Sequence, residues 1–423
     1  MLVRKKLVRL SIYELREKIS RASIVLGIFS LLFFFSSASS SNPSGGGIYP
    51  DYNSNPIPAD ITDMSSTAAR LASRITLGWN LGNSLEAIGG ETAWGNPRTT
   101  RQLIQLVKSS GFDSIRLPVS WDQYADQATA EIDRGWMNRV TEVAQWCLDS
   151  DMTVLLNIHW DGGWLEQNVY ADAQELVNAK QKALWQQIAT HFRDFDERLM
   201  FAGSNEPAVE DASGMGVLLS YHQTFIDAVR ATGGKNAYRI LVVQGPTTDI
   251  EKTHQFMRTL PEDTVADRLM VEVHFYTPYQ FALMLKDEPW GNQFFYWGAG
   301  NHSQTDTAHN PTGGEEARVD QLFGLMKTRF ADRGIPVVLG EYAAINRFGQ
   351  LSGDNLQRHI QSRAYWHRYI TQSALANGLL PYYWDNGSND KHSSGIFDRD
   401  TNTVFDIETL NALNQGVGRQ AGP

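Results

Sequence analysis

The chain contains a single cysteine, Cys147, among 423 residues. One thiol cannot form an internal disulfide bond, and it cannot supply an ordinary structural zinc site. The sequence also lacks the His-Glu-x-x-His helix of metalloproteases and any tight group of His and Cys residues. We therefore expect no metal and no cofactor, and we expect Cys147 to be a buried and unreactive thiol.

A glycine-rich phosphate-binding turn is missing as well. A doubly wound dinucleotide-binding sheet carries such a turn after its first strand, and residues 78–83 do not have that pattern. The net charge is −10, and basic residues gather in the first 41 positions, so the rest of the chain is more acidic still. An acidic body argues against nucleic acid and anionic membrane surfaces as partners of the mature protein.

No apolar run is long enough to span a bilayer in the usual way. The run at residues 24–35 is shorter than the roughly 20 residues that a membrane-spanning helix needs. A basic segment precedes it and small residues follow it at 36–41, which is typical of a secretory signal peptide. We predict that residues 1–41 are a signal peptide, with an uncleaved anchor as the alternative. We therefore expect a bacterial protein that is exported to the cell exterior, with a periplasmic or surface-tethered location as alternatives.

Residues 42–59 are rich in Gly, Ser, Pro and Asn, a composition that predicts a short disordered tether. One folded domain is expected at 60–423. Within it, apolar segments at 75–80, 114–118, 153–159, 199–203, 239–244, 269–274, 336–341 and 379–384 read as strands. Amphipathic stretches between them predict helices at 100–110, 137–150, 179–195, 217–232, 319–333 and 357–377. This alternation predicts an α/β fold, the (β/α)8 TIM barrel with enlarged βα loops.

Polar and aromatic side chains gather where the predicted strands end. These residues are Asn80, Arg116, His159, Asn205, Glu206, His274, Tyr276, Glu341 and Trp384. In a parallel barrel, the carboxyl ends of the strands form the active face. Glu206 and Glu341 end the fourth and seventh strands, and two facing carboxyl groups are the tools of glycoside hydrolysis. A single polar residue at a strand end is more often structural, so the interpretation rests on the ordered set.

Eight short motifs occur in a fixed order along the chain. They are Gly78-Trp-Asn-Leu-Gly-Asn, Glu91-Thr-Ala-Trp-Gly-Asn-Pro, Ile115-Arg-Leu-Pro, Asn157-Ile-His-Trp, Asn205-Glu-Pro, Val273-His-Phe-Tyr-Thr-Pro, Leu339-Gly-Glu-Tyr and Tyr383-Trp-Asp-Asn-Gly. The set resembles glycoside hydrolase family 5, within the clan of retaining (β/α)8 enzymes, and its endo-β-1,4-glucanase and xyloglucanase branch. The resemblance covers nearly everything from residue 61 to the C-terminus. Glu86 stands where others of this branch carry Asp, and we expect that position to face a distal subsite.

The resemblance implies that Glu341 is the nucleophile and Glu206 the general acid/base. A retaining enzyme needs the two carboxyl groups about 5–5.5 Å apart. We expect Arg116 to keep Glu341 ionised through a charge-assisted hydrogen bond. The Glu341 charge is in turn expected to raise the pKa of Glu206.

The remaining residues of the set would support the pair or hold the sugar. The resemblance implies that Asn205 donates to the sugar 2-hydroxyl and that Tyr276 orients Glu341. His159 and His274 would bond sugar hydroxyls or the carboxylates, and Trp384 would form an apolar floor under the sugar. Asn80 is expected in a supporting position.

The sequence therefore predicts a secreted, monomeric, endo-acting β-1,4-glucanase whose partner is a polysaccharide. Xyloglucanase, β-mannanase and xylanase remain alternatives with the same fold and mechanism. A glucan-binding surface protein without catalysis is an alternative of another class, and the presence of two opposed acids argues against it.

Overall fold

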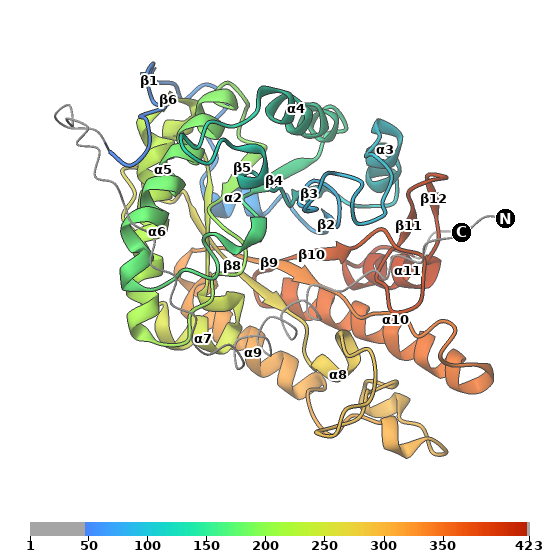
Figure 1. Cartoon of the computed structure of the whole chain (residues 1–423). Helices are drawn as coiled ribbons and strands as arrows, with labels where there is room; N and C mark the ends of the chain where they lie inside the picture. The colour runs from blue at the N-terminus through green and yellow to red at the C-terminus, as the bar shows by residue number, and fades with distance from the viewer. Residues whose placement is uncertain (1–46, 421–423) are drawn as a thin grey trace, which may run out of the picture. The chain divides into compact units, whose positions relative to one another are not determined.

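Eight parallel strands close into a barrel, with helices around it (Figure 1). The computed structural model describes residues 47–420. The barrel strands are β2 (Gly78–Leu81), β3 (Ser114–Leu117), β4 (Thr153–Asn157), β5 (Leu199–Ala202), β7 (Leu241–Gln244), β8 (Leu269–Phe275), β9 (Val337–Tyr342) and β10 (Leu379–Asp385). Each is paired in parallel with its two neighbours, and β10 closes the circle against β2. The predicted TIM barrel and all eight predicted strands are confirmed.

Six helices cover the barrel where the sequence predicts them, each within a few residues of the expected bounds. They are α3 (Arg101–Ser109), α4 (Arg134–Asp149), α5 (Gln174–His191), α6 (Ala212–Ala231), α9 (Glu316–Arg329) and α10 (Gly353–Ala376). Side-chain caps fix several starts: Thr100 accepts from the backbone N–H of Leu103, and Asp133 accepts from that of Trp136.

The structure adds elements that the sequence analysis did not predict. The helices are α2 (Ala68–Ala72), α7 (Ile250–Phe256), α8 (Tyr279–Ala282) and α11 (Ile407–Gly416), and the strands are β1 (Ile57–Ala59), β6 (Gly233–Gly234), β11 (Phe397–Asp398) and β12 (Thr403–Val404). α11 packs along α10, and the buried ion pair between Arg363 and Asp406 joins the two helices at 2.7 Å. Asp406 also caps α11 by accepting from the backbone N–H of Thr409.

The folded unit includes residues that the sequence predicts to be part of a tether. The sequence predicts a disordered tether at 42–59, but residues 47–59 pack on helix α5 and on loops outside the barrel strands. Tyr52 donates to the carbonyl of Thr129, its backbone N–H donates to Gln186, and β1 pairs with β6. The compact unit therefore begins at Gly47 rather than near residue 60. The predicted signal peptide and the start of the tether lie outside the described residues.

The barrel interior is apolar at one end and polar at the other. Leu155, Met200, Val242 and Met270 fill the amino-terminal end, which the short helix α2 covers. Two residues further along their strands, the same inward register reaches polar side chains such as Gln244 and Glu272. The polar layer therefore lies at the carboxyl end of the barrel, above a packed apolar layer. Active sites of such barrels lie at this end.

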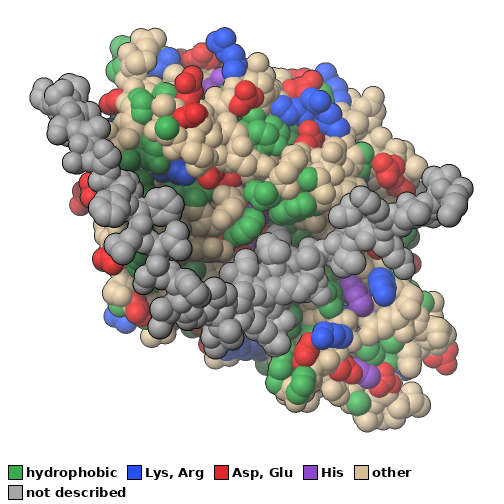
Figure 2. Space-filling model, in the orientation of Figure 1, with side chains coloured by type: hydrophobic (Ala, Val, Ile, Leu, Met, Phe, Trp, Pro, Cys, Tyr) green, Lys and Arg blue, Asp and Glu red, His purple; other side chains and the backbone are tan. Residues whose placement is uncertain are grey.

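The long segment between α8 and α9 divides into a buried part and an exposed part. It projects from the barrel beside α10 in Figure 1. Phe294, Phe295, Tyr296 and Trp297 are buried, whereas Trp290 is 63% exposed at the tip of a tight turn. Over the face in Figure 2, acidic and basic side chains are interspersed among neutral ones. Among residues 47–420, no helix combines the length and apolarity needed to cross a membrane.

Arg239 offers a direct test of how the barrel is held to its helices. It is fully buried just before β7 and donates to five backbone carbonyls and to Asn236. Arg239→Leu removes these hydrogen bonds from a buried position, so we expect the free energy of unfolding to fall by about 3 kcal/mol or more. Chemical denaturation measures the change. Arg101→Leu, which removes a half-exposed surface pair with Asp149, should cost less than about 1 kcal/mol. Equal effects would contradict the account.

Candidate active site

Arg116 lies at the centre of the polar layer. Its side chain is fully buried on β3 and its guanidinium contacts four side chains. One Nη donates to Asn80 and to Glu341 at 3.0 Å each, and the other donates to Asn205 at 2.8 Å. Nε forms an ion pair with Glu272 at 2.8 Å. Burial lowers the pKa of Arg116, but Glu272 and Glu341 outweigh it and the pKa rises, so the guanidinium is a fixed charge.

The two predicted catalytic carboxylates face each other beside this arginine. One oxygen of Glu206, one oxygen of Glu341 and one ring nitrogen of His274 lie within 4.8 Å of one another. Glu341 is the last residue but one of β9 and is almost completely buried, whereas Glu206 follows β5 and keeps 22% of its side chain exposed. The separation agrees with the spacing of about 5–5.5 Å in retaining glycosidases and is shorter than the roughly 6.5–9.5 Å of inverting ones.

Glu341 is held by two donors, one on each carboxylate oxygen. Arg116 donates to one oxygen at 3.0 Å, and Tyr276 donates to the other at 2.9 Å. Burial raises the pKa of Glu341 and Glu206 adds to the rise, while His274, Arg116 and Tyr276 lower it. The balance is a raised pKa, so Arg116 opposes protonation of Glu341 as expected but does not bring its pKa below the ordinary value.

His274 lies between carboxylates on both sides of its ring. Nδ1 is 2.9 Å from Glu206, Nε2 is 3.2 Å from Glu272, and Nδ1 is 3.7 Å from Glu341. Burial lowers the pKa of His274. Glu341, Glu206 and Glu272 raise it by more than burial lowers it, and the resulting pKa is about 10. At neutral pH the ring is therefore an imidazolium that donates from both nitrogens.

His159 has the opposite character. Burial and the nearby Arg116 and His274 charges hold its pKa well below the ordinary value, so the ring is neutral. It stacks on Trp384 with ring centroids 5.6 Å apart and planes 11° from parallel. Trp384 is half-buried, and a side chain on Gly82 would meet its ring at 2.9 Å. His159 also lies near Glu341, because its Nε2 is 4.0 Å from a carboxylate oxygen of that residue.

Asn80 and Asn205 differ in whether their side-chain NH2 group is available to a ligand. Asn80 is fully buried and donates to the carbonyls of Gly340, Tyr382 and Tyr383, so its role is to support Arg116. Asn205 turns its oxygen to Arg116, which can only donate. This contact orients the amide and leaves its NH2 group on the other side.

Glu272 is a site residue that the sequence analysis missed. It is fully buried on β8, accepts from Gln244 at 2.7 Å and faces Arg116 and His274. Burial disfavours its charge, but Arg116 and His274 hold its pKa below the ordinary value. Its position two residues before His274 places both on one face of the strand, a signal present in the sequence.

Gly340 makes room for this buried acid. The register between β8 and β9 shifts here, because Val273 pairs with Leu339 while His274 pairs with Glu341. A Cβ atom on Gly340 would lie 2.0 Å from an oxygen of Glu272. The irregularity and the missing side chain together set Glu341 beside Glu206.

Glu206, His274 and Glu341 also have the spacing of a metal-binding group. An ion bound there would have to displace a proton from His274, whose pKa the neighbouring carboxylates raise to about 10. Metal-free chemistry remains our expectation for these residues.

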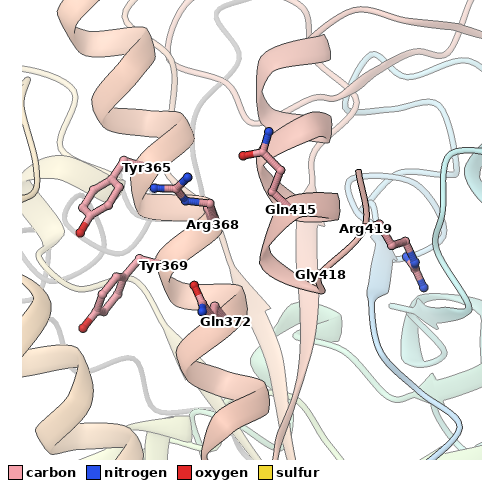
Figure 3. Close-up of a pocket in the computed structure, with 7 residues that line it drawn as sticks. All are labelled: Tyr365, Arg368, Tyr369, Gln372, Gln415, Gly418 and Arg419. Atoms are coloured by element: carbon pink, nitrogen blue, oxygen red, sulfur yellow. The ribbon is translucent and has the colours of Figure 1, made fainter. Parts of the chain in front are cut away.

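Two other features lie away from the carboxylate pair. Glu86, expected to face a distal subsite, is buried and accepts from the backbone of its own loop, at Asn83 and Ser84. A shallow hollow between α10 and the end of α11 is lined by Tyr365, Arg368, Tyr369, Gln372, Gln415, Gly418 and Arg419 (Figure 3). Tyr365 and Tyr369 donate to acidic residues of α9, and no carboxylate lines the hollow.

A parallel barrel with two opposed acids at its carboxyl face defines a class of glycoside-cleaving proteins. The chain matches the Cellulase family, glycosyl hydrolase family 5, over residues 80–390. It belongs to this family and is a glycosidase.

Characterised relatives agree with this assignment. A xyloglucan-specific endo-β-1,4-glucanase of Bacteroides ovatus is 36% identical over 385 residues, covering 87% of this chain and 74% of the relative. Endoglucanase A of Paenibacillus barcinonensis is also 36% identical over 385 residues, covering 85% and 92%. The solved structure of a xyloglucan-specific β-1,4-glucanase from a ruminal metagenomic library, in complex with XXLG, has a TM-score of 0.78 and 40% identity, covering 85% and 98%.

Gly340→Ala tests the link between the strand irregularity and the site. The new methyl group must displace the Glu272 carboxylate, which three partners hold in place. We expect hydrolytic activity to fall by about 100-fold and the unfolding midpoint to drop. The measurements are initial rates on a soluble β-glucan and thermal unfolding. Gly324→Ala is the matched control, because no atom lies within 4 Å of its Cβ position inside α9. A wild-type rate for Gly340→Ala would show that Glu272 need not stay in place.

Proposed function

We propose that this protein is a retaining endo-β-1,4-glucanase that cleaves β-glucan by double displacement. The observation that carries the proposal is the separation of Glu206 and Glu341, whose nearest oxygens lie within 4.8 Å. That distance suits attack by one carboxylate while the other serves the departing oxygen of the same bond.

In the first step, Glu341 attacks the anomeric carbon and Glu206 gives its proton to the departing glycosidic oxygen. The product is a glycosyl ester on Glu341 and a shortened glucan. Arg116 and Tyr276 each hold one oxygen of Glu341, so the carboxylate is oriented before the sugar arrives. Its raised pKa describes the ligand-free pair, in which the Glu206 carboxyl is one of the causes.

In the second step, water attacks the anomeric carbon and gives a proton to Glu206, and Glu341 leaves as a carboxylate. Glu206 must be ionised for this step. The His274 imidazolium at 2.9 Å stabilises that ionised form.

The sugar at the cleavage point would lie on Trp384. Aromatic rings offer an apolar face that matches the axial C–H groups of a pyranose. The NH2 group of Asn205, oriented by Arg116, would donate to the 2-hydroxyl, a bond that strengthens in the transition state.

Xyloglucan is the second candidate substrate. Two of the three relatives described above are specific for xyloglucan by name, and the third is an endoglucanase. We further propose that the enzyme is exported and acts as a monomer. Export rests on the basic and apolar pattern of residues 1–41.

Glu206→Gln separates the acid role from binding. With a glucan, whose departing alcohol needs a proton, we expect kcat/KM to fall by about 100- to 10,000-fold. With a 2,4-dinitrophenyl cellooligosaccharide, whose phenolate leaves unaided, formation of the glycosyl-enzyme should remain fast. Release of dinitrophenolate in stopped flow measures it. Glu210→Gln removes an exposed acid of the same segment and should match the wild type on both substrates. Equal losses of Glu206→Gln on both substrates would contradict the acid role.

A mechanism-based label and a substrate panel test the nucleophile and the substrate. An activated 2-fluoro cellooligosaccharide should trap a covalent adduct, and peptide mass spectrometry should map it to Glu341. Labelling at Glu206 would reverse the two roles. Reducing-sugar release should be greatest on xyloglucan or mixed β-glucan and weak on mannan and xylan. Absence of activity on every β-linked glucan would overturn the proposal.

A further inference from the structure

Glu272 is a fully buried carboxylate for which the two-step reaction has no direct use. It reaches neither the anomeric carbon nor the departing oxygen in the scheme above. Its oxygens are occupied by Arg116 at 2.8 Å, His274 at 3.2 Å and Gln244 at 2.7 Å. Burying a third acid beside Glu206 and Glu341 is costly unless the acid is paired and hydrogen-bonded, and these partners supply that pairing.

His274 connects this third acid to the acid/base residue. Its Nε2 faces Glu272 and its Nδ1 faces Glu206. A neutral imidazole has only one N–H, so it could donate to one of these carboxylates and would oppose the other with a lone pair. The ring must therefore be doubly protonated whenever Glu206 and Glu272 are both ionised.

The anions around His274 do not all persist through the reaction. Glu341 loses its charge when it becomes an ester, and Glu206 is protonated before the first step and ionised after it. Glu272 is the member of this trio that no step alters. A constant positive charge on His274 therefore needs a constant negative partner, and Glu272 has that position.

We infer that Glu272 is a positioning residue that keeps His274 an imidazolium through both steps, so that Glu206 is an ionised base when it takes the proton of the incoming water in the second step. This inference rests on the proposed double displacement. In the second step the water oxygen bonds to the anomeric carbon, the bond to Glu341 breaks with its electron pair, and the proton of the water passes to Glu206. If His274 had given its Nδ1 proton to Glu206, that base would already be occupied.

The charges of the neighbouring elements agree with this assignment. Arg116 from β3 is a fixed cation, His159 after β4 is neutral, and Tyr276 keeps its proton. Glu341 and Glu206 contribute to the high pKa of His274, and Glu272 adds to it through the hydrogen bond at Nε2. The pKa of Glu272 itself is lowered, because Arg116 and His274 outweigh its burial.

The test is Glu272→Gln with a 2,4-dinitrophenyl cellooligosaccharide, whose first step needs no acid. In the variant, His274 gives its proton to Glu206 in the glycosyl-enzyme, so the second step slows by at least about tenfold. We expect a burst of one equivalent of dinitrophenolate, and kcat and KM should fall together. Because deprotonation of the His274–Glu206 pair restores the base, kcat should rise with pH in the variant, whereas the wild type should show no such rise.

Gln244→Met is the matched control, because it removes another partner of Glu272 without removing the charge. It should lower stability and leave the shape of the pH profile unchanged. Glu272→Asp keeps the charge and should show no burst. A Glu272→Gln enzyme with the wild-type pH profile and an equal loss in both steps would mean that Glu272 only fills space, which overturns the inference.

A second measurement needs no variant. Nitrogen-15 NMR of the His274 ring should show both nitrogens protonated at about pH 8, above the ordinary histidine pKa of about 6.5, in the free enzyme and in the 2-fluoroglycosyl adduct. A singly protonated ring in either form overturns the inference. If the wild type forms no adduct, the proposed function fails, and the spectrum of the free enzyme still decides whether His274 is held as a cation.

Discussion

The site depends on the buried guanidinium of Arg116. A guanidinium can only donate, so each of its neighbours must turn an oxygen toward it. This requirement orients Asn80, Asn205, Glu272 and Glu341 from four different strands or strand ends. The barrel makes the arrangement possible because parallel strands bring their carboxyl ends to one face. A buried charge of this kind is tolerated only with partners of good geometry.

Charge at the site alternates outward from this cation. Arg116 faces the acids Glu272 and Glu341, and these face the His274 imidazolium, which in turn faces Glu206. Burial alone would favour the neutral form of each group. The opposite charges of the network keep Arg116 and His274 charged, and these cations in turn favour the ionised form of the acids beside them. The position of Glu206 at the partly exposed end gives substrate and water access to it.

The barrel and the principal site residues could be predicted from the sequence, because both leave a pattern within a few consecutive residues. Strands such as 153–157 are apolar runs, and functional residues follow them at the strand ends. Glu272 was missed because it lies inside the apolar run Leu269–Phe275, where only alternation along the strand relates it to His274. Residues 47–59 read as a linker by composition, yet their order depends on distant partners such as Thr129 and Gln186. Such contacts have no local signal.

The central claim is that the close spacing of Glu206 and Glu341 makes each glycosidic bond break in two displacements. The anomeric configuration of the first-formed product tests it most directly. Proton NMR of a cellooligosaccharide digest, recorded before mutarotation, should show the β-anomer at the new reducing end. Initial formation of the α-anomer would mean a single displacement by water and would contradict the account.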